Sequence, residues 1–135
     1  MSQQNVEIVR RLLDAYNRGD GDAVGILFHP EIEWRPVAGP LIGVDALHGR
    51  EESLRFMFEQ VPEVLDGFRV VSDELRALPD GGVLSLAHYE GQGTASGAPV
   101  EMTSAAIYRF QAGMILSFTE YASREEALEA AGLSE

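Results

Sequence analysis

Cysteine and lysine are both absent from this chain of 135 residues. Without cysteine the chain has no disulfide framework, no thiolate metal ligand and no cysteine nucleophile. Its ten basic residues, all scattered arginines, stand against 22 acidic ones, so the net charge is −12. Such a charge repels a phosphate backbone, and we therefore expect no nucleic acid among its partners. The same field favours neutral or cationic small molecules over anionic ones.

Long hydrophobic runs are also missing. No apolar stretch approaches the roughly 20 residues that a membrane-spanning helix needs. The polar residues from Met1 to Asn5 lack the basic and apolar regions of a secretory signal. We therefore expect a cytoplasmic protein with no membrane partner. With 45% hydrophobic residues, the chain suits a single domain over residues 1–135.

Helical spacing dominates the first third of the chain. Apolar residues from Val6 to Tyr16 recur every three or four positions, which places them on one face of a helix that Gly19 ends. Asp20 is expected to cap a second, short helix that runs through Phe28 and stops at Pro30.

Two further helices are predicted. Apolar residues between Gly49 and Val61 share a helix face, and Pro62 lies where that helix should end. Near the end of the chain, Ser123 and Glu126 have the spacing of a capping box, which opens a short helix.

Alternating apolar and polar residues predict strands in the rest of the chain, at 32–35, 67–78, 82–93, 99–110 and 114–122. Turn sequences at 79–82 and 111–113 separate several of them, so we expect antiparallel hairpins. Helices first and strands afterwards predict an α+β fold, with the N-terminal helices packed on one face of an antiparallel sheet.

The order of several short motifs resembles a known family. They include Asn17-Arg18-Gly19-Asp20, the segment from Pro30 to Pro36, Gly49-Arg50-Glu51-Glu52, and Glu120-Tyr121 ahead of the last helix. Together they resemble the SnoaL-like branch of the NTF2-like superfamily, related to ketosteroid isomerases. The resemblance implies a cone in which a strongly curved sheet wraps around the helices. It also implies an internal pocket and a homodimer formed through the outer sheet face.

The family includes isomerases, polyketide cyclases and epoxide hydrolases, so the fold does not settle the function. The ketosteroid isomerase pattern is not matched: Leu12 stands where it has a tyrosine, Trp34-Arg35-Pro36 stands where it has a carboxylate just after the first strand, and Ala106 replaces its acid. The two aspartates and arginine of a limonene epoxide hydrolase are missing as well. A polyketide cyclase needs only one acid inside the cone, and Glu120 meets that requirement.

Glu120 is the main catalytic candidate. It alternates with Leu116 and Phe118, and the resemblance places that strand face inward. A carboxyl group in an apolar cavity favours its protonated form, which suits a general acid or base. The alternative is a structural ion pair with Arg35 or Arg50. His48, in the loop before the third helix, is a second candidate base at the pocket mouth.

The remaining site candidates are expected to line the pocket. Trp34 either stacks on a ligand or packs in the core, and Ser85 and Tyr89 offer hydroxyl groups. The small residues Ser104 and Ala106 favour either an open pocket or close helix packing. The predicted lining is Tyr16, Trp34, Met57, Phe58, Ser85, Tyr89, Met102, Ser104, Tyr108 and Phe118.

No cofactor and no metal are expected. The three histidines are scattered, without the spacing of a metal site. His29 is assigned to a helix end and His88 to the outer sheet surface, as a solvated or interface residue.

We therefore expect a small hydrophobic molecule as ligand and acid–base chemistry of the isomerase, cyclase or hydrolase type. The competing hypothesis is a binding or scaffold protein without catalysis. A homodimer is further favoured by apolar residues on the outward sheet face, which a monomer would expose to water, namely Leu84, Leu86, Ala105 and Ile107.

Overall fold

The computed structural model describes residues 2–37 and 39–133. Its helices and helical turns are α1 (Ser2–Arg18), α2 (Gly21–Gly25), η1 (Gly39–Ile42), α3 (Arg50–Arg55), η2 (Phe56–Gln60), α4 (Val61–Val64) and α5 (Arg124–Ala130). Its strands are β1 (Phe28–Arg35), β2 (Leu47–His48), β3 (Leu65–Ala77), β4 (Val83–Gly93), β5 (Pro99–Thr103), β6 (Ala105–Gln111) and β7 (Met114–Tyr121). No helix within the described ranges is long and apolar enough to cross a membrane.

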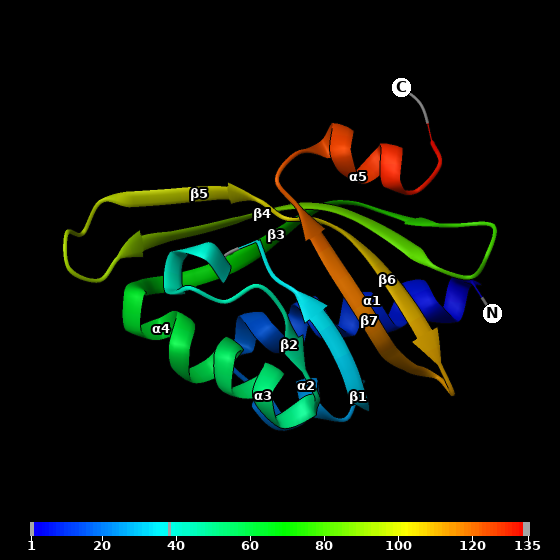
Figure 1. The fold of residues 1–135 in the computed structure, drawn as a ribbon, viewed down its shortest axis with the longest axis horizontal. Coiled ribbons are helices and arrows are strands. Elements are labelled where there is room, and N and C mark those ends of the chain that lie inside the picture. Colours follow the sequence, from blue (N-terminus) through cyan, green and yellow to red (C-terminus); the bar gives the residue numbers. More distant parts are fainter. Residues whose placement is uncertain (1, 38, 134–135) are drawn as a thin grey trace.

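The expected α+β architecture is confirmed. The strands form one curved, unclosed sheet in the order β2-β1-β7-β6-β4-β3, and β5 extends it by pairing with β4. Helices α1 to α4 lie on one side of this sheet and α5 lies on the other (Figure 1). The pairs β3/β4, β4/β5 and β6/β7 are antiparallel, as expected. However, β1 runs parallel to β7, because the two strands are joined through most of the chain and not by a hairpin.

The first helix forms as its apolar spacing predicts. Val9, Leu12 and Ala15 are almost fully buried against the sheet, and Gly19 adopts a positive φ of 72° where the helix ends. At the same end, the side-chain amide of Asn17 donates to the carbonyl of Val70 over 2.8 Å. Its oxygen accepts from the amide of Val70 over 2.9 Å. The pair of bonds fixes α1 to strand β3.

The second helix is shorter than predicted. Asp20 caps it as expected, since its carboxylate accepts from the amide of Ala23 over 3.1 Å. The helix ends at Gly25, however, and residues 28–30 already belong to β1. His29 therefore does not lie at a helix end, and its Nδ1 instead accepts a hydrogen bond from the amide of Glu31.

The third helical segment contains a π turn that its spacing did not predict. Between α3 and α4, residues 56–60 widen into this turn, and the amide of Val61 donates to the carbonyl of Phe56 five residues earlier. Pro62 follows at once and has no amide hydrogen, so a regular α-helical bond is impossible there. The turn brings both Phe56 and Met57 into the buried interior.

The four apolar residues expected to be exposed on the outward sheet face are buried, which corrects one premise used for a homodimer. Leu84, Leu86 and Ile107 are each at most 6% exposed. They form a second apolar cluster with Ala127 and Leu128 of α5. Ser123 opens that helix by accepting from the amide of Glu126 over 3.1 Å, as half of the predicted capping box. The helix covers the surface that was expected to pair with another subunit.

Candidate functional site

Glu120 lies near the end of β7 with its carboxylate turned into the interior. It is only 9% exposed and stands opposite Ala106 of the neighbouring strand β6. The antiparallel ladder places both residues on the inner face, together with Phe118 and Tyr108 one pair further along. The alternation along β7 thus leads to a buried acid on the helix-covered side of the sheet.

Four hydrogen-bond donors surround this carboxylate. The hydroxyls of Tyr89 and Ser104 donate to Oε2 over 2.6 and 2.8 Å. The backbone amide of Val37 donates to Oε1 over 2.9 Å, and Trp34 Nε1 reaches the same oxygen over 3.4 Å. The donors come from three parts of the chain, at residues 34–37, 89 and 104, so the fold holds the carboxylate in one orientation.

Two opposing effects act on the pKa of Glu120. Burial raises it, because the charged form is removed from water, while the hydrogen bonds from Tyr89, Val37, Ser104 and Trp34 lower it. Burial prevails, and the pKa lies above the ordinary value of a glutamate. The proton is therefore held more tightly than on a surface carboxyl group.

The predicted alternative, an ion pair with arginine, is not formed. Arg35 pairs with Glu33 over 3.1 Å, and Arg50 donates to the carbonyl of Phe28 over 2.7 Å. Within the described part of the chain, every hydrogen-bond donor to Glu120 is a neutral group. All the described partners of the carboxylate are thus hydrogen-bond donors, and none of them carries a positive charge.

Tyrosine hydroxyls near the carboxylate are also perturbed. Burial raises the pKa of Tyr16, Tyr89 and Tyr108 above that of free tyrosine, and the negative charge of Glu120 raises each further. These phenols remain neutral at physiological pH, so they can donate hydrogen bonds but do not serve as bases.

A small cavity adjoins Glu120. Its volume is about 30 Å³. Half of the lining residues are aromatic, and Glu120 is the one carboxylic acid among them. The lining consists of Leu12, Leu13, Tyr16, Trp34, Pro36, Phe56, Met57, Val61, Phe68, Val70, Tyr89, Tyr108, Phe118 and Glu120.

Trp34 both packs in the core and lines the cavity. Its ring stacks on Phe118 with centroids 4.8 Å apart and meets Phe56 edge-on at 5.1 Å. Tyr108 extends the stack on the far side of Phe118, at 4.9 Å. This aromatic wall is rigid, since each ring is held by the next. The two roles predicted for Trp34 are therefore compatible.

The structure brings part of the predicted set together. Tyr16, Trp34, Met57, Tyr89, Tyr108, Phe118 and Glu120 all line the cavity. Ser104 lies behind the carboxylate and contacts it through its hydroxyl. Three predicted residues lie elsewhere. Phe58 packs on Tyr16 beside Gly21, Ser85 is buried opposite Ala106, and Met102 is half-buried opposite Tyr89.

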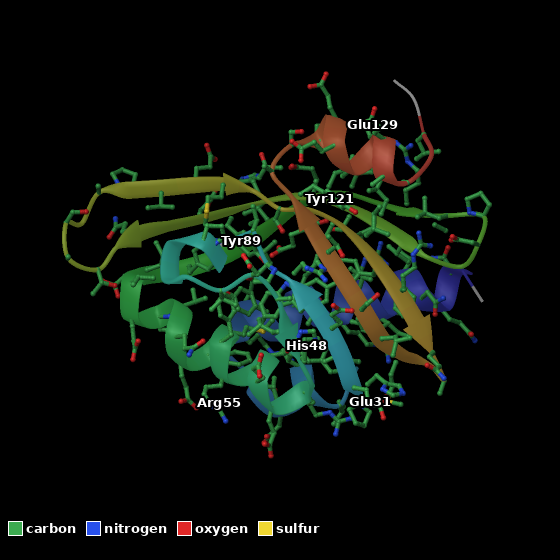
Figure 2. The ribbon with its side chains drawn as sticks, in the orientation of Figure 1. Glu31, His48, Arg55, Tyr89, Tyr121 and Glu129 are labelled. Atoms are coloured by element: carbon green, nitrogen blue, oxygen red, sulfur yellow. The ribbon has the colours of Figure 1, made fainter. Side chains whose placement is uncertain are left out.

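His48 does not belong to this site. It is exposed on β2 and stands opposite Glu33, while its neighbour Leu47 stands opposite Trp34. Since facing residues of a ladder share one side of the sheet, His48 points away from the cavity. Figure 2 shows it well apart from Tyr89. His48 was expected at the pocket mouth because it precedes the third helix in the sequence. The register of β1 and β2 excludes that position.

One other group of described residues could hold a metal ion. Ligand atoms of His88, Glu90 and Glu101 lie within 4.8 Å of one another. His88 also approaches Asp73, with its Nδ1 3.4 Å from the carboxylate. Alternation along β4 places this group on the opposite face from Tyr89, outside the cavity. The carboxylates raise the pKa of His88, chiefly through the hydrogen bond to Glu90.

Half of the cavity lining was not among the predicted residues. Leu12 and Leu13 could have been found, because both lie on the apolar face of α1. Phe56 enters through the π turn and Val37 through its backbone amide, and neither has a sequence pattern that points to the site. Phe68 lies in an irregular part of the β3/β4 ladder, and its ring stacks on that of Tyr89 with centroids 4.5 Å apart.

Comparison with known proteins gives a family and a fold. The model of the SnoaL-like domain matches residues 9–118. None of the curated proteins matches the chain. An NTF2-like protein from Burkholderia thailandensis has a similar structure, with a TM-score of 0.78 and 25% identity over 96% of this chain and 98% of that one.

Two further solved structures share the fold. A protein with a ketosteroid isomerase-like fold from Catenulispora acidiphila, in complex with trimethylamine, has a TM-score of 0.74 and 22% identity over 95% of this chain and 94% of that one. The epoxide hydrolase/cyclase-like enzyme SalBIII, which takes part in pyran ring formation in the polyether salinomycin, has a TM-score of 0.75 and 21% identity over 92% and 95%.

Proposed function

The chain belongs to the SnoaL-like domain family, and from that premise we propose that it is an acid–base enzyme that transfers a proton to or from a small molecule held beside Glu120. The observation that carries the proposal is a buried carboxylate on the wall of an aromatic cavity, positioned by four neutral donors. The reaction class is isomerisation, cyclisation or hydrolysis, each of which needs one well-placed acid or base.

Burial and hydrogen bonding give Glu120 the properties of such a group. A raised pKa brings the carboxyl closer to neutrality, where one side chain can both accept and return a proton. Tyr89 and Ser104 fix Oε2, and Val37 fixes Oε1. The carboxylate therefore needs little reorganisation when the reaction begins.

The dimensions of the cavity limit the ligand. Typical small-molecule pockets measure roughly 300 to 1,000 Å³. A cavity of about 30 Å³ holds only a small group beside Glu120. A whole steroid therefore does not fit without rearrangement. The mismatches at Leu12, Arg35 and Ala106 also disfavour ketosteroid isomerisation. A cyclase or hydrolase reaction is the better match, and SalBIII shows that an enzyme of similar fold is described as cyclase-like.

A second function, binding without turnover, is favoured by one observation. Each oxygen of Glu120 already accepts two hydrogen bonds, so the carboxylate is satisfied without a substrate. The Catenulispora protein, crystallised with trimethylamine, supports a small ligand for a protein of this fold. In that case the carboxylate shapes and charges the pocket and does not exchange protons with the ligand.

Replacing Glu120 with Gln separates the two functions. Binding is followed through the fluorescence of Trp34, the sole tryptophan, which lines the cavity. The panel consists of small terpenes, epoxides, polyketide-like aromatics and amines, and turnover is followed by product analysis. For an enzyme, Glu120→Gln abolishes turnover of a bound compound while binding persists. Glu129→Gln, an exposed change on α5, is the matched control. Turnover that survives in Glu120→Gln contradicts the proposal.

A further inference from the structure

We propose that the ligand beside Glu120 is a small organic cation of the methylated ammonium type, with its charge next to the carboxylate and its methyl groups against the aromatic rings. This inference rests on the proposed function only in placing the ligand at Glu120. It specifies the chemical class of the ligand, and it holds for an enzyme and for a binding protein alike.

In the part of the chain that the structure describes, no cationic side chain pairs with Glu120. Glu120 is nearly inaccessible to water, and its described partners are a tyrosine, a serine, a tryptophan and a backbone amide. Arg35 and Arg50, the arginines expected as its partners, are bound to other groups. A buried ionised carboxylate without a cation is costly, and neutral donors offset only part of that cost. A ligand that carries a positive charge supplies what the protein does not.

The aromatic lining of the cavity also favours a cation. Seven rings border the cavity, from Tyr16, Trp34, Phe56, Phe68, Tyr89, Tyr108 and Phe118. Phe118 is stacked between Trp34 and Tyr108, so a cation would meet the faces of the other rings. The face of an aromatic ring carries negative electrostatic potential, which attracts a cation within about 6 Å of the ring centre. Quaternary and methylated ammonium groups are recognised by such sets of rings because their methyl groups spread the charge over an apolar surface. A hydrocarbon of the same shape gains the contact but not this attraction.

The size of the cavity and the net charge of the protein both favour a compact cation. Typical small-molecule pockets measure roughly 300 to 1,000 Å³. The cavity has a volume of only about 30 Å³, so it suits a compact head group better than a ring system. Outside the cavity, the net charge of −12 attracts cations and repels anions during approach.

The competing arrangement is a protonated Glu120 with a neutral ligand. The two differ in their pH dependence. A cation binds the ionised carboxylate, so its affinity rises as pH increases through the pKa of Glu120, and the bound cation lowers that pKa in turn. Tyr16, Tyr89 and Tyr108 also face the carboxylate, but they remain neutral in this pH range. A neutral ligand gains nothing from ionisation of Glu120.

The experiment compares choline with its neutral isostere, in which carbon replaces the ammonium nitrogen. Tetramethylammonium serves as a smaller cation. Each compound is titrated into the full chain with Trp34 fluorescence and calorimetry as readouts. We expect the cations to bind about tenfold or more tightly than the isostere, and the difference to disappear in Glu120→Gln, which keeps the shape and removes the charge. The same titration of the unaltered protein between pH 5 and 9 requires no variant, and choline affinity should increase with pH.

Equal or tighter binding of the neutral isostere overturns the cation proposal and leaves the proton-transfer proposal standing. Cation binding that is unchanged in Glu120→Gln also overturns it, as does the absence of binding by any of the cations. If a cation binds as expected and no compound of the panel is turned over, the cation proposal stands and the enzymatic one fails.

Discussion

The hydroxyl of Tyr89 on β4 reaches Oε2 of Glu120 on β7 over 2.6 Å, although strand β6 lies between them. Between them, Ala106 of β6 stands opposite Glu120, and Ser104, just before β6, donates to the same oxygen. The small size of these two residues is compatible with an open pocket or with close helix packing. They also leave room for a tyrosine to span the middle strand and hold the acid in place.

Replacing Tyr89 with Phe tests this bond. The hydrogen bond from Tyr89 lowers the pKa of Glu120, so its removal should raise that pKa further. We expect the pH profile of ligand binding to shift toward alkaline pH, with a loss of stability of about 1 to 2 kcal/mol. Tyr121→Phe, a half-buried tyrosine that packs against the second apolar cluster, is the control. An unchanged pH profile in Tyr89→Phe would show that the bond does not tune Glu120.

Glu120 should also make stability depend on pH. Its folded-state pKa is raised, so the folded protein holds the proton more tightly than the unfolded chain. Its contribution is therefore fully present below the unfolded pKa of about 4.3 and is lost as pH rises through the folded pKa. Chemical denaturation at several pH values should show this decline in the unaltered protein. The slope should be smaller in Glu120→Gln, and identical slopes in both proteins would refute the assignment.

His88 should act in the same direction through a different cause. Its pKa is raised by hydrogen bonds to Glu90 and Asp73, and Glu101 lies 3.8 Å away. The stabilisation is present below the unfolded pKa of about 6.5 and is lost as pH rises through the folded value. We expect His88→Gln to be destabilised relative to the unaltered protein at pH 5.5, and less so at pH 9. His48→Gln on the exposed strand β2 controls for the loss of one histidine.

Asn17 should contribute more to stability than other exposed residues of α1 do. Its amide satisfies both the carbonyl and the amide of Val70, and Asn17→Ala removes both bonds at once. We expect a loss of about 1 to 3 kcal/mol in the free energy of unfolding, measured with urea. Asp14→Ala, exposed on α1, is the control. A loss no greater than that of Asp14→Ala would mean that water replaces the amide.

The last helix should keep the outer sheet face from associating. Leu128 is 3% exposed and packs on Leu84 and Leu86. Leu128→Ala should destabilise the chain by about 2 to 4 kcal/mol. Removing residues 123–135 should expose the apolar cluster and cause concentration-dependent association, visible in sedimentation velocity. The exposed change Glu129→Ala should do neither. A truncated chain that stays monomeric would contradict this role for α5.

These results show which features could be predicted from the sequence. Helix α1 follows from local periodicity, because each repeat fixes which side chains share a face. Alternation likewise placed Glu120 on one face with Phe118, and the family resemblance placed that face inward. The π turn at residues 56–60 arises from the position of Pro62 within a packed helix, and the parallel pairing of β1 with β7 arises from the whole topology. Neither is visible in a short window of sequence.

The outward apolar face gives the clearest example of the limit. Alternation correctly assigned Leu84 and Ile107 to the face opposite Tyr89. Periodicity reports that such a face is buried but not what buries it, and the partner proved to be α5 of the same chain. For the cavity, likewise, the side-chain donors of Glu120 had candidate residues in the sequence, whereas the amide of Val37 did not.

The bond between Asn17 and Val70 also has a consequence for self-association. Strand β3 forms one end of the main sheet, and its free edge presents unpaired amides and carbonyls to any passing strand. The side chain of Asn17 occupies one of these positions with the donor and acceptor that an incoming chain would use. A single amide on a helix thus blocks the middle of an edge where strand-by-strand growth into larger aggregates would otherwise begin.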